Sequence, residues 1–389
     1  MKISIIGSGL MGPAAAYNAM ADPAVTQVMM CDVSEAQLAV SAAVLQGKPG
    51  ADILHFIPLD LRDQAATVAH MGHYDVIIAA LPKTVHTLAI RAALKAGKPL
   101  VDLSQVPEDI KAELRAEAAP NNLIVLGSGV EPGLTEVMAR YLAEQMDRVD
   151  ELHIKCGGIP ANPQPPLNYK IVFGGRLMPV REQDSEVVVA GKIQMVPRYS
   201  GVEAVTFPGV GDCEAWHEGF KPWILDIPAL QHIHTGTQKT VRWPGYAAQI
   251  TVLKELGLLS KKPVLVDGME VIPKHLVDAV LYPQVKLDEG EHDITCFRVE
   301  LVGEKDGRSC IYQAEMVDKY DVTTGFTSMA RTTAMTGAIV ARMIANGTVT
   351  ATGAPITTPE QLITGQQVEQ LLAELAAAGM EMMITQRFI

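Results

Sequence analysis

A glycine-rich turn near the N-terminus, residues 7–12, offers the first spacing with chemical meaning. The apolar residues before it, 3–6, predict a buried strand, and the alanine-rich residues after it, 13–20, predict a helix. In this order the first glycine permits a tight turn, the second lets a pyrophosphate approach the backbone, and the third lets helix and strand pack closely. The free amides of the helix N-terminus attract the phosphates. The residues predicted to bind a dinucleotide here are Gly7, Gly9, Leu10, Met11 and Gly12.

An acidic residue at the end of the next apolar run refines this prediction. Asp32 follows residues 28–31 and lies 20 positions after Gly12. A carboxylate there can accept hydrogen bonds from both ribose hydroxyls and would repel a 2′-phosphate. Residues 33–35 are Val-Ser-Glu, so no arginine follows directly. The sequence therefore predicts NAD rather than NADP. The alternative is an ordinary domain of the same fold whose glycine turn binds nothing.

Apolar runs alternate with helical segments over the first 126 residues, which predicts a doubly wound parallel sheet, a Rossmann domain, at residues 1–128. Ligands of such sheets bind at the carboxyl ends of the strands. The sequence leaves open whether Asp60 flanks the adenine or caps a helix from Arg62, and whether Ser104 contacts the nicotinamide or caps a helix from Pro107. The further residues predicted to contact the cofactor are Asp60, Leu61, Ala80, Leu81, Pro82 and Ser104.

The rest of the chain predicts a second α+β domain with a mixed or antiparallel sheet at residues 129–324. Its expected helices are 247–258 and 274–282, and two apolar helices, 332–345 and 359–378, should form a tail (325–389) that completes the first domain. The expected strands are 151–156, 169–172 and 186–189, together with a hairpin of 293–302 and 309–316 turning at 303–307.

The bulk composition excludes several classes of protein. The chain has 389 residues, which is too long for one ordinary hydrophobic core, so more than one domain is expected. With 48% hydrophobic and 20% charged residues, its composition is that of a globular protein. A net charge of −12 without a basic block argues against nucleic acid. We expect no membrane span, because no long apolar run occurs. The five scattered cysteines and the absence of a signal peptide predict free thiols in a reducing cytoplasm, with no metal site.

Short motifs along most of the chain resemble those of the saccharopine dehydrogenase-like oxidoreductases, and within them the NAD-dependent L-lysine 6-dehydrogenases. The resemblance implies hydride transfer at a carbon that bears nitrogen, with L-lysine as the substrate and ammonia as a product. It also implies that the second domain supplies a substrate pocket and the contacts of a homodimer. The motifs are 7–12, 101–104, 129–134, 156–160, 242–246 with 255–259, and 325–330.

Glu131 is the first candidate to bind or deprotonate the amine, because amine oxidation needs a group that takes a proton from the ammonium. Relatives commonly carry Asp at this position, so the carboxylate is moved by one methylene. The alternative is a carboxylate that the dipole of the following helix stabilises. Ser104, already a cofactor candidate, is also a candidate for contact with the substrate.

The second domain adds four candidates. In the resembling family the stretch at Cys156 lies near the substrate, although a buried strand cysteine is a common structural residue. Lys170 is a candidate base if burial lowers its pKa, and otherwise it is a solvated strand residue. Tyr169 beside it is a candidate for contact with the substrate. Arg242 can bind an α-carboxylate bidentately or can be a solvated strand residue. The rival functions are a saccharopine-type enzyme acting on a secondary amine and a non-catalytic NAD-binding sensor.

Overall fold

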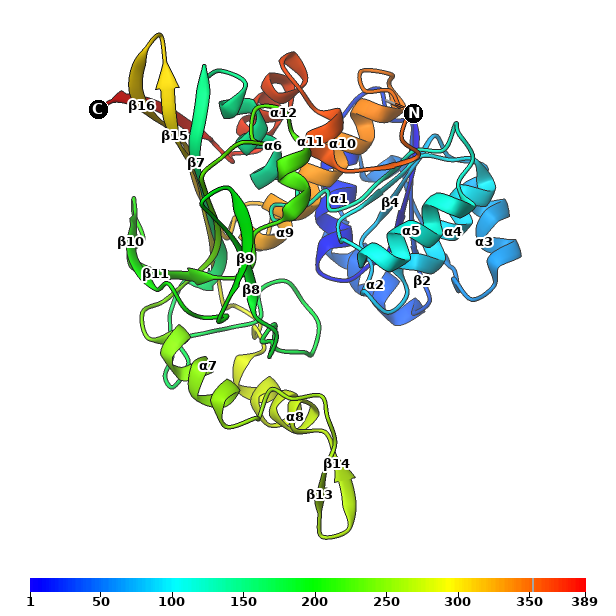
Figure 1. Cartoon of the computed structure of the whole chain (residues 1–389). Helices are drawn as coiled ribbons and strands as arrows, with labels where there is room; N and C mark the ends of the chain where they lie inside the picture. The colour runs from blue at the N-terminus through cyan, green and yellow to red at the C-terminus, as the bar shows by residue number, and fades with distance from the viewer. Residues whose placement is uncertain (352) are drawn as a thin grey trace. The chain divides into compact units, whose positions relative to one another are not determined.

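A computed structural model describes residues 1–351 and 353–389 and divides the chain into two compact units (Figure 1). The first unit consists of Met1–Tyr141, Asp321–Phe326 and Ala330–Met380. The second consists of Leu142–Tyr320, Thr327–Met329 and Glu381–Ile389. The first unit contains a parallel sheet and the second a mixed sheet, which confirms the predicted fold class.

The sheet of the first unit has seven parallel strands in the order β17-β6-β5-β4-β1-β2-β3. Its central strands are buried on both faces, which explains their continuous apolar sequences. All six predicted strands form, and the seventh comes from a region where the sequence predicted only helices. The strands are β1 (Lys2–Ile6), β2 (Gln27–Asp32), β3 (Leu54–Pro58), β4 (Val76–Ala79), β5 (Leu100–Asp102), β6 (Ile124–Val125) and β17 (Ile356–Thr357).

Helices cover both faces of this sheet (Figure 1). On one face α1 (Met11–Met20) contacts α2 (Glu35–Leu45) and α10 (Thr336–Ala345). On the other α4 (His86–Ala96) contacts α3 (Gln64–Met71) and α5 (Glu108–Glu117). Within the described residues, no helix is long and apolar enough to cross a membrane.

The C-terminal segment differs from the predicted helical tail. A π-helical turn, Arg331–Met335, precedes α10, and the long helix expected at 359–378 is divided into α11 (Pro359–Leu362) and α12 (Gln366–Ala377). Residues 381–389 belong to the second unit, where β18 (Met383–Phe388) pairs with β16. The first unit also extends to Tyr141, beyond the predicted boundary at residue 128.

The sheet of the second unit is built around a long central strand, β7, which pairs in parallel with β12 and antiparallel with β15. Buried and half-buried residues alternate along part of each of the three longest strands, β7, β15 and β16. The strands are β7 (Arg148–Pro160), β8 (Ser185–Val189), β9 (Lys192–Val196), β10 (Glu203–Phe207), β11 (Gly211–His217), β12 (Thr235–Arg242), β15 (Asp293–Lys305), β16 (Arg308–Lys319) and β18.

Several predicted elements of this unit were wrong in detail. The strand expected at 169–172 is irregular, apart from an isolated bridge between Ile171 and Lys286. The hairpin of β15 and β16 turns on two residues, Asp306 and Gly307, rather than on 303–307, and both have positive φ as a type I′ turn requires.

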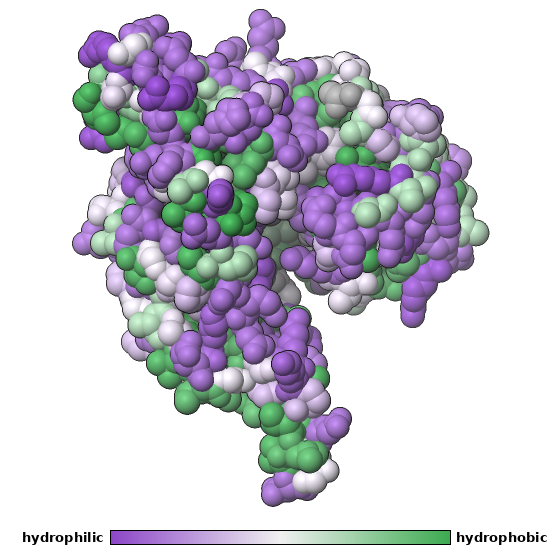
Figure 2. Space-filling view, in the orientation of Figure 1, coloured by the Kyte–Doolittle hydropathy of each residue, from purple (hydrophilic) through white to green (hydrophobic). Residues whose placement is uncertain are grey.

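Two helices lie at one end of the second unit, α7 (Tyr246–Glu255) and α8 (Pro273–Val285). Between them in sequence, β13 (Val264–Val266) and β14 (Met269–Val271) form a separate two-stranded hairpin that the sequence analysis missed. Figure 2 shows that apolar surface gathers on this hairpin.

A buried carboxyl group in the first unit has an unusual protonation. Glu360 in α11 is 1% exposed, and burial, together with the nearby Glu136, raises its pKa from 4.5 to about 7. Thr358 donates its hydroxyl to Glu360, which opposes the shift. Between pH 4.5 and 7 the folded chain keeps this proton and the unfolded chain loses it. The contribution of this retained proton to the free energy of unfolding is therefore complete below pH 4.5 and is lost as the pH rises through 7.

We expect Glu360→Gln to stabilise the first unit at pH 8 by about 1–3 kcal/mol, because an amide never has to ionise in this site. Near pH 4.5 the variant and the parent should unfold at the same urea concentration. Circular dichroism reports the unfolding, and the fluorescence of the three tryptophans, all in the second unit, separates the two units. The exposed Asp52→Asn is the control, and an equal pH dependence for Glu360→Gln and parent would contradict the assignment.

Candidate functional site

The glycine turn of the first unit has the geometry expected of a phosphate-binding loop. Gly7 has a φ of +102°, and a Cβ on it would lie 2.2 Å from the carbonyl oxygen of Ala80. A Cβ on Gly12 would lie 2.1 Å from the carbonyl oxygen of Gly7. Gly9 instead faces open space. Two glycines are therefore fixed by backbone contacts, and the middle one is left open to a ligand.

The start of α1 is suited to an anion. Its first turn contains no acidic residue, and Leu10 provides no side-chain cap. The amides at this end of the helix are thus available to phosphate oxygens, and the helix dipole favours negative charge there. Met11 begins the helix, so it and Leu10 lie at the predicted position.

Asp32 ends β2 and holds the glycine turn in place. Its Oδ2 accepts hydrogen bonds from the Ser8 amide at 2.8 Å and the Ser8 hydroxyl at 3.0 Å, while Oδ1 accepts from the Ser34 amide at 2.9 Å. No lysine or arginine among the described residues forms an ion pair with Asp32. The carboxylate is half-buried and keeps acceptor capacity for a ribose hydroxyl.

Some of the other predicted cofactor residues lie beside the glycine turn, and one lies in the hydrophobic core. Ala80 and Leu81 lie against Gly7, and Pro82, which is exposed, follows them. Leu61 is buried in the core, so only its backbone can face a ligand.

Asp60 is paired with its neighbour Arg62, whose guanidinium lowers the pKa of the carboxyl to about 2. The helix cap considered for Asp60 is wrong, because α3 begins at Gln64 and the Asp63 carboxylate caps it at 3.0 Å.

A buried histidine and aspartate at the carboxyl ends of the central strands were missed by sequence reasoning. His86 Nδ1 lies 3.0 Å from Asp102 Oδ2, and both side chains are almost inaccessible to water. Burial raises the pKa of Asp102, and His86 opposes this effect. The other oxygen, Oδ1, accepts the Ser104 amide at 2.8 Å. The sequence signals for this pair were weak. His86 lies just beyond the fourth strand, and Asp102 lies within the motif at 101–104.

The backbone around Asp102 connects Ser104 to the turn that carries Glu131. The Ser128 amide donates to the Asp102 carbonyl at 2.9 Å, and the Gly127 amide donates to the Ser104 carbonyl at 2.8 Å. Ser104 does not cap a helix, since α5 begins at Glu108 after Pro107. Two predicted candidates, Ser104 and Glu131, are therefore brought into one hydrogen-bonded region.

Glu131 itself is half-buried, three residues before α6 (Leu134–Ala143). The carboxylate that accepts the Gly133 amide at the start of this helix is that of Glu136, at 2.6 Å. Glu136 thereby anchors the end of the turn that presents Glu131. Both residues belong to the first unit.

The second unit contains a cationic site at Arg242. Its guanidinium lies 5.0 Å from the ring centre of Tyr169 and 5.8 Å from that of Tyr246, within cation–π range. A Cβ on Gly157 would lie 2.3 Å from the Val241 carbonyl oxygen and 2.8 Å from Arg242 Nη1, so the backbone of β12 requires glycine here and the guanidinium lies against it. Burial raises the pKa of Tyr169 to about 12, against the effect of Arg242. The cluster is therefore a neutral aromatic support for one positive charge.

Arg242 differs from the other buried cations in the described part of the second unit. It is 8% exposed, yet no carboxylate lies within ion-pair distance and its Nε has no hydrogen-bond partner among the described residues. The other buried cations each have an acidic partner: Lys170 with Glu291, Arg198 with Glu218, Lys239 with Glu203 and Lys274 with Asp278. The guanidinium does donate through Nη1 to the Val241 carbonyl at 2.7 Å, but a buried charge without a carboxylate and a buried Nε donor without an acceptor indicate an anionic ligand. The solvated alternative for Arg242 is wrong.

Lys170 does not have the environment of a base. Its Nζ lies 2.9 Å from Glu291 and 3.7 Å from Asp288, and it donates to the Lys286 carbonyl. The solvated alternative is equally wrong, because Lys170 is 7% exposed. The arrangement is that of a structural ion pair.

Cys156 is 2% exposed in β7, where it pairs with Thr240 of β12 and directly precedes Gly157, the glycine that lies against Arg242. None of the five cysteines forms a disulfide, and all five are buried. No group of histidine, cysteine and acidic side chains in the described residues is arranged to hold a metal ion.

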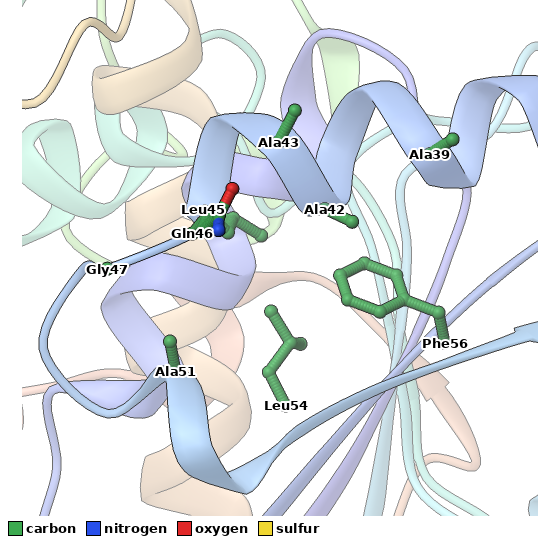
Figure 3. Close-up of a pocket in the computed structure, with 9 residues that line it drawn as sticks. All are labelled: Ala39, Ala42, Ala43, Leu45, Gln46, Gly47, Ala51, Leu54 and Phe56. Carbon is green, nitrogen blue, oxygen red and sulfur yellow. The ribbon is translucent and has the colours of Figure 1, made fainter.

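An apolar groove of about 490 Å³ lies between α2 and β3 in the first unit (Figure 3). Leu54 and Phe56 line it from the strand side, and small side chains of α2 line it from the other. None of its lining residues can act as an acid or a base. The groove is therefore not a reaction site.

Two family models match the chain, and the second of them extends over residues of both units. Residues 3–126 match the family model described as the saccharopine dehydrogenase NADP binding domain, and residues 129–380 match the saccharopine dehydrogenase C-terminal domain. Residues 3–126 are thus a pyridine-nucleotide-binding domain.

Two relatives and one solved structure illustrate the similarity. The saccharopine dehydrogenase [NADP(+), L-glutamate-forming] of Pyricularia oryzae is 27% identical over 290 residues, which cover 69% of this chain and 60% of that protein. The Schizosaccharomyces pombe protein of the same name is 24% identical over 81% of this chain and 85% of its own. The structure of apo saccharopine dehydrogenase (L-Glu forming) from Saccharomyces cerevisiae aligns over 100% of this chain and 99% of its own, with a TM-score of 0.77 and 18% identity.

These names bear on the resemblance drawn from the motifs. They carry the saccharopine dehydrogenase name rather than that of lysine 6-dehydrogenase, so the broader part of the resemblance is confirmed and the narrower part stays a proposal. The matches of both domain models, which together cover most of the chain, show that this protein belongs to the saccharopine dehydrogenase family.

Proposed function

We propose that this chain is an NAD-dependent dehydrogenase that oxidises the carbon–nitrogen bond of a basic amino acid, with L-lysine as the substrate. The observation that carries the proposal is Arg242, a buried guanidinium without a carboxylate of its own. The planar fork of an arginine matches a carboxylate with two parallel hydrogen bonds. Arg242 would therefore bind the α-carboxylate of the amino acid, with Tyr169 supporting the guanidinium.

The cofactor proposal rests on the first unit. The open turn at Gly9 and the start of α1 suit a pyrophosphate, and Asp32 suits the ribose. When bound, NAD supplies the acceptor for the hydride that leaves the carbon–nitrogen centre. The relatives named above use NADP(+), but here the Asp32 carboxylate would repel a 2′-phosphate. Arg62, after the neighbouring strand, is held by Asp60.

Glu131 would handle the proton of the reaction. It takes a proton from the substrate ammonium, so that the nitrogen lone pair can form the C=N bond while the C–H bond breaks. Water then adds to the C=N carbon, the C–N bond breaks, and the former ε-carbon becomes an aldehyde as ammonia leaves. His86 and Asp102 would be positioning residues. They fix the turn at Ser104, and the turn that carries Glu131 is hydrogen-bonded to that turn.

The charge of the second unit favours lysine over saccharopine. Lysine carries one carboxylate, whereas saccharopine carries several, and Arg242 is the one buried cation of the described second unit without an acidic partner. The names of the relatives favour the other candidate, a saccharopine-type enzyme acting on a secondary amine.

A substrate panel tests the proposal directly. Purified protein with NAD and L-lysine should form NADH and release ammonia. If NADH is formed only with saccharopine, or is consumed only when an amine and a keto acid or aldehyde are both present, the saccharopine-type function is correct. Tight NAD binding without turnover of any amine would contradict both enzymatic functions and favour a non-catalytic NAD-binding sensor.

Asp32→Ala should raise the KM for NAD roughly 10-fold or more and reduce the preference for NAD over NADP, because hydrogen bonds to a charged group and the repulsion of a 2′-phosphate are both lost. Initial rates with each cofactor measure this. Asp60→Ala, at the next strand end, should change the KM far less, since Arg62 already occupies that carboxylate. An unchanged cofactor preference in Asp32→Ala would exclude the ribose role.

Glu131→Gln should lower kcat by about 100-fold or more at a nearly unchanged KM for NAD, because the amide cannot accept the proton. The acidic limb of the pH–rate profile should disappear with it. Glu131→Asp is the matched control, which keeps the carboxylate and should retain part of the rate. A Glu131→Gln enzyme with the parent rate would return Glu131 to a role at the helix start.

Arg242→Met should raise the KM for L-lysine by about 100-fold, since a bidentate charge-assisted contact is lost while the packing on Tyr169 is kept. The decisive comparison is pentane-1,5-diamine, which has the amine of lysine but no carboxylate. The substitution should leave the kcat/KM of this diamine nearly unchanged. An equal loss for both substrates would mean general damage to the pocket and not a carboxylate contact.

A further inference from the structure

Two buried cysteines of the second unit take no part in the proposed reaction. Cys213 lies in β11 and Cys296 in β15, and they are 2% and 0% exposed. Both belong to one buried cluster, which they share with apolar side chains of β7, β10 and β12. The Cys296 thiol donates a hydrogen bond to the sulfur of Cys213, so the two sulfur atoms are in contact.

The fold brings these thiols together although their strands are not neighbours in the sheet. β12 and β7 lie between β11 and β15 in the strand order. The hairpin of β10 and β11 bends back onto β15, where Arg298 donates to the Thr206 carbonyl at 2.8 Å and its guanidinium lies 4.7 Å from the ring centre of Phe207. Lys319 of β16 donates to the Gly209 carbonyl at 3.0 Å. These contacts hold β11 over β15.

A third cysteine of this sheet, Cys156, lies on the opposite face. Cys296 pairs with Gly157 between β15 and β7, and Cys156 is the residue before Gly157. Side chains alternate between the two faces of a sheet along each strand. Cys156 therefore faces away from Cys296, and Cys213 is the cysteine that Cys296 can reach.

The protonation of this pair differs from that of other buried cysteines in the chain. Burial raises the pKa of Cys31 to about 12, and it also raises the pKa of Cys310. The hydrogen bond from Cys296 instead lowers the pKa of Cys213, and the same bond, together with burial, raises the pKa of Cys296 well above its usual range. The thiolate is the nucleophilic form of cysteine. Cys213 therefore has the character of an attacking thiol, and Cys296 that of a partner that keeps its proton.

We propose that Cys213 and Cys296 form a dithiol that a hydroperoxide oxidises to a disulfide. The Cys213 thiolate attacks one peroxide oxygen and becomes a sulfenic acid. The O–O bond breaks, and the other oxygen leaves as an alcohol or water with the proton that Cys213 released. The Cys296 sulfur then attacks the sulfenic sulfur, the S–O bond breaks, and the departing hydroxide takes the Cys296 proton and becomes water. The two thiols thus supply the two electrons that reduce one peroxide, and an external dithiol reverses the change.

The exposed end of β11 gives a small oxidant a route to the pair. Gly211 and Asp212 directly precede Cys213 and are exposed, whereas Cys213 is the first buried residue of the strand. A hydroperoxide therefore has to pass only the end of the strand to reach the thiol that attacks it.

A disulfide at this place would act on the surroundings of Arg242. Glu214, next to Cys213, accepts two amides at the start of α7, at 2.6 and 2.8 Å, and the first residue of α7 packs on Arg242. On the other strand, Cys296 pairs with Gly157, which lies against Arg242. A disulfide brings its sulfur atoms to about 2.05 Å, closer than hydrogen-bonded thiols, so β11 and β15 must approach each other. We expect this movement to disturb the guanidinium.

A count of the thiols tests the oxidation without any measurement of activity. The folded protein is treated with hydrogen peroxide, denatured and labelled with N-ethylmaleimide. The mass should then show two labels fewer than the five of the untreated protein, and dithiothreitol should restore both. Peptide mapping should find Cys213 joined to Cys296. The matched control, Cys310→Ala, removes another buried cysteine of the second unit and should still lose two labels. Full labelling of the oxidised parent, or a disulfide between other cysteines, would overturn the proposal.

Single variants identify the attacking thiol. In Cys296→Ala the oxidation should stop at the sulfenic acid, which dimedone traps on Cys213. In Cys213→Ala the same peroxide concentration should give no adduct, because Cys296 keeps its proton. A dimedone adduct on Cys296 in Cys213→Ala would overturn the assigned order of attack. The thiol count of the parent needs no variant and stands whether or not these two proteins fold.

The effect on the substrate rests on the proposed function. Oxidation of the parent should raise the KM for L-lysine about 10-fold and leave the KM for NAD unchanged, because Arg242 lies in the second unit and the glycine turn in the first. Cys296→Ala, which cannot form the disulfide, should keep its KM after the same treatment. An unchanged KM for L-lysine in the fully oxidised parent would overturn the connection to Arg242. No turnover of L-lysine by the reduced parent would contradict the proposed function alone, since the thiol count and the dimedone adduct decide the dithiol without it.

Discussion

The buried carboxylate of Asp102 holds together the turns of the first unit that carry the candidate site residues. It lies at the carboxyl end of β5, out of reach of water, where an isolated charge would be very costly. Its two oxygens are used by His86 and by the Ser104 amide, and its backbone carbonyl is used by Ser128. The start of α4, the turn after β5 and the turn before α6 are thereby tied to one residue. The turn that carries the candidate base Glu131 is hydrogen-bonded to this network on one side and to Glu136 on the other.

The second unit uses the opposite arrangement around Arg242. Elsewhere in the unit each buried cation of the described residues meets a carboxylate, which offsets the cost of removing the charge from water. Arg242 has aromatic rings and the bare backbone of Gly157 instead. The guanidinium therefore lacks the acidic partner that a structural ion pair would have, and it can accept an anionic ligand in that place. This contrast, more than the identity of any single residue, supports the assignment of a ligand to Arg242 and of none to Lys170.

The sequence predicted the first unit well because its signals are local. Buried parallel strands give continuous apolar runs, and the helices between them have recognisable ends such as the Ser34 cap of α2. The second unit depends on pairing between distant segments, as in β12 with β7, and the burial of Arg242 follows from that pairing and not from its neighbours in sequence.

The sequence also failed to predict the two hairpin turns and the ion pairs of Lys170. Asp267-Gly268 and Asp306-Gly307 are strong hairpin signals, and they were overlooked or misplaced. The ion pairs of Lys170 join it to Asp288 and Glu291, more than a hundred residues away, which no local pattern reveals.

Asp32 shows how closely the choice of cofactor is bound to the shape of its site. The carboxylate that would meet the ribose also accepts the amide and the hydroxyl of Ser8, inside the glycine turn. Ser8 in turn accepts hydrogen bonds from Gln37 and Ser41 of α2 through its carbonyl oxygen. Replacing Asp32 by a residue that tolerates a 2′-phosphate would thus loosen the glycine turn, the proposed site of the pyrophosphate. For the proposed NAD-dependent enzyme, a change toward NADP would therefore require a new partner for Ser8 as well as a new cation, since the proposed specificity and the shape of the turn depend on the same carboxylate.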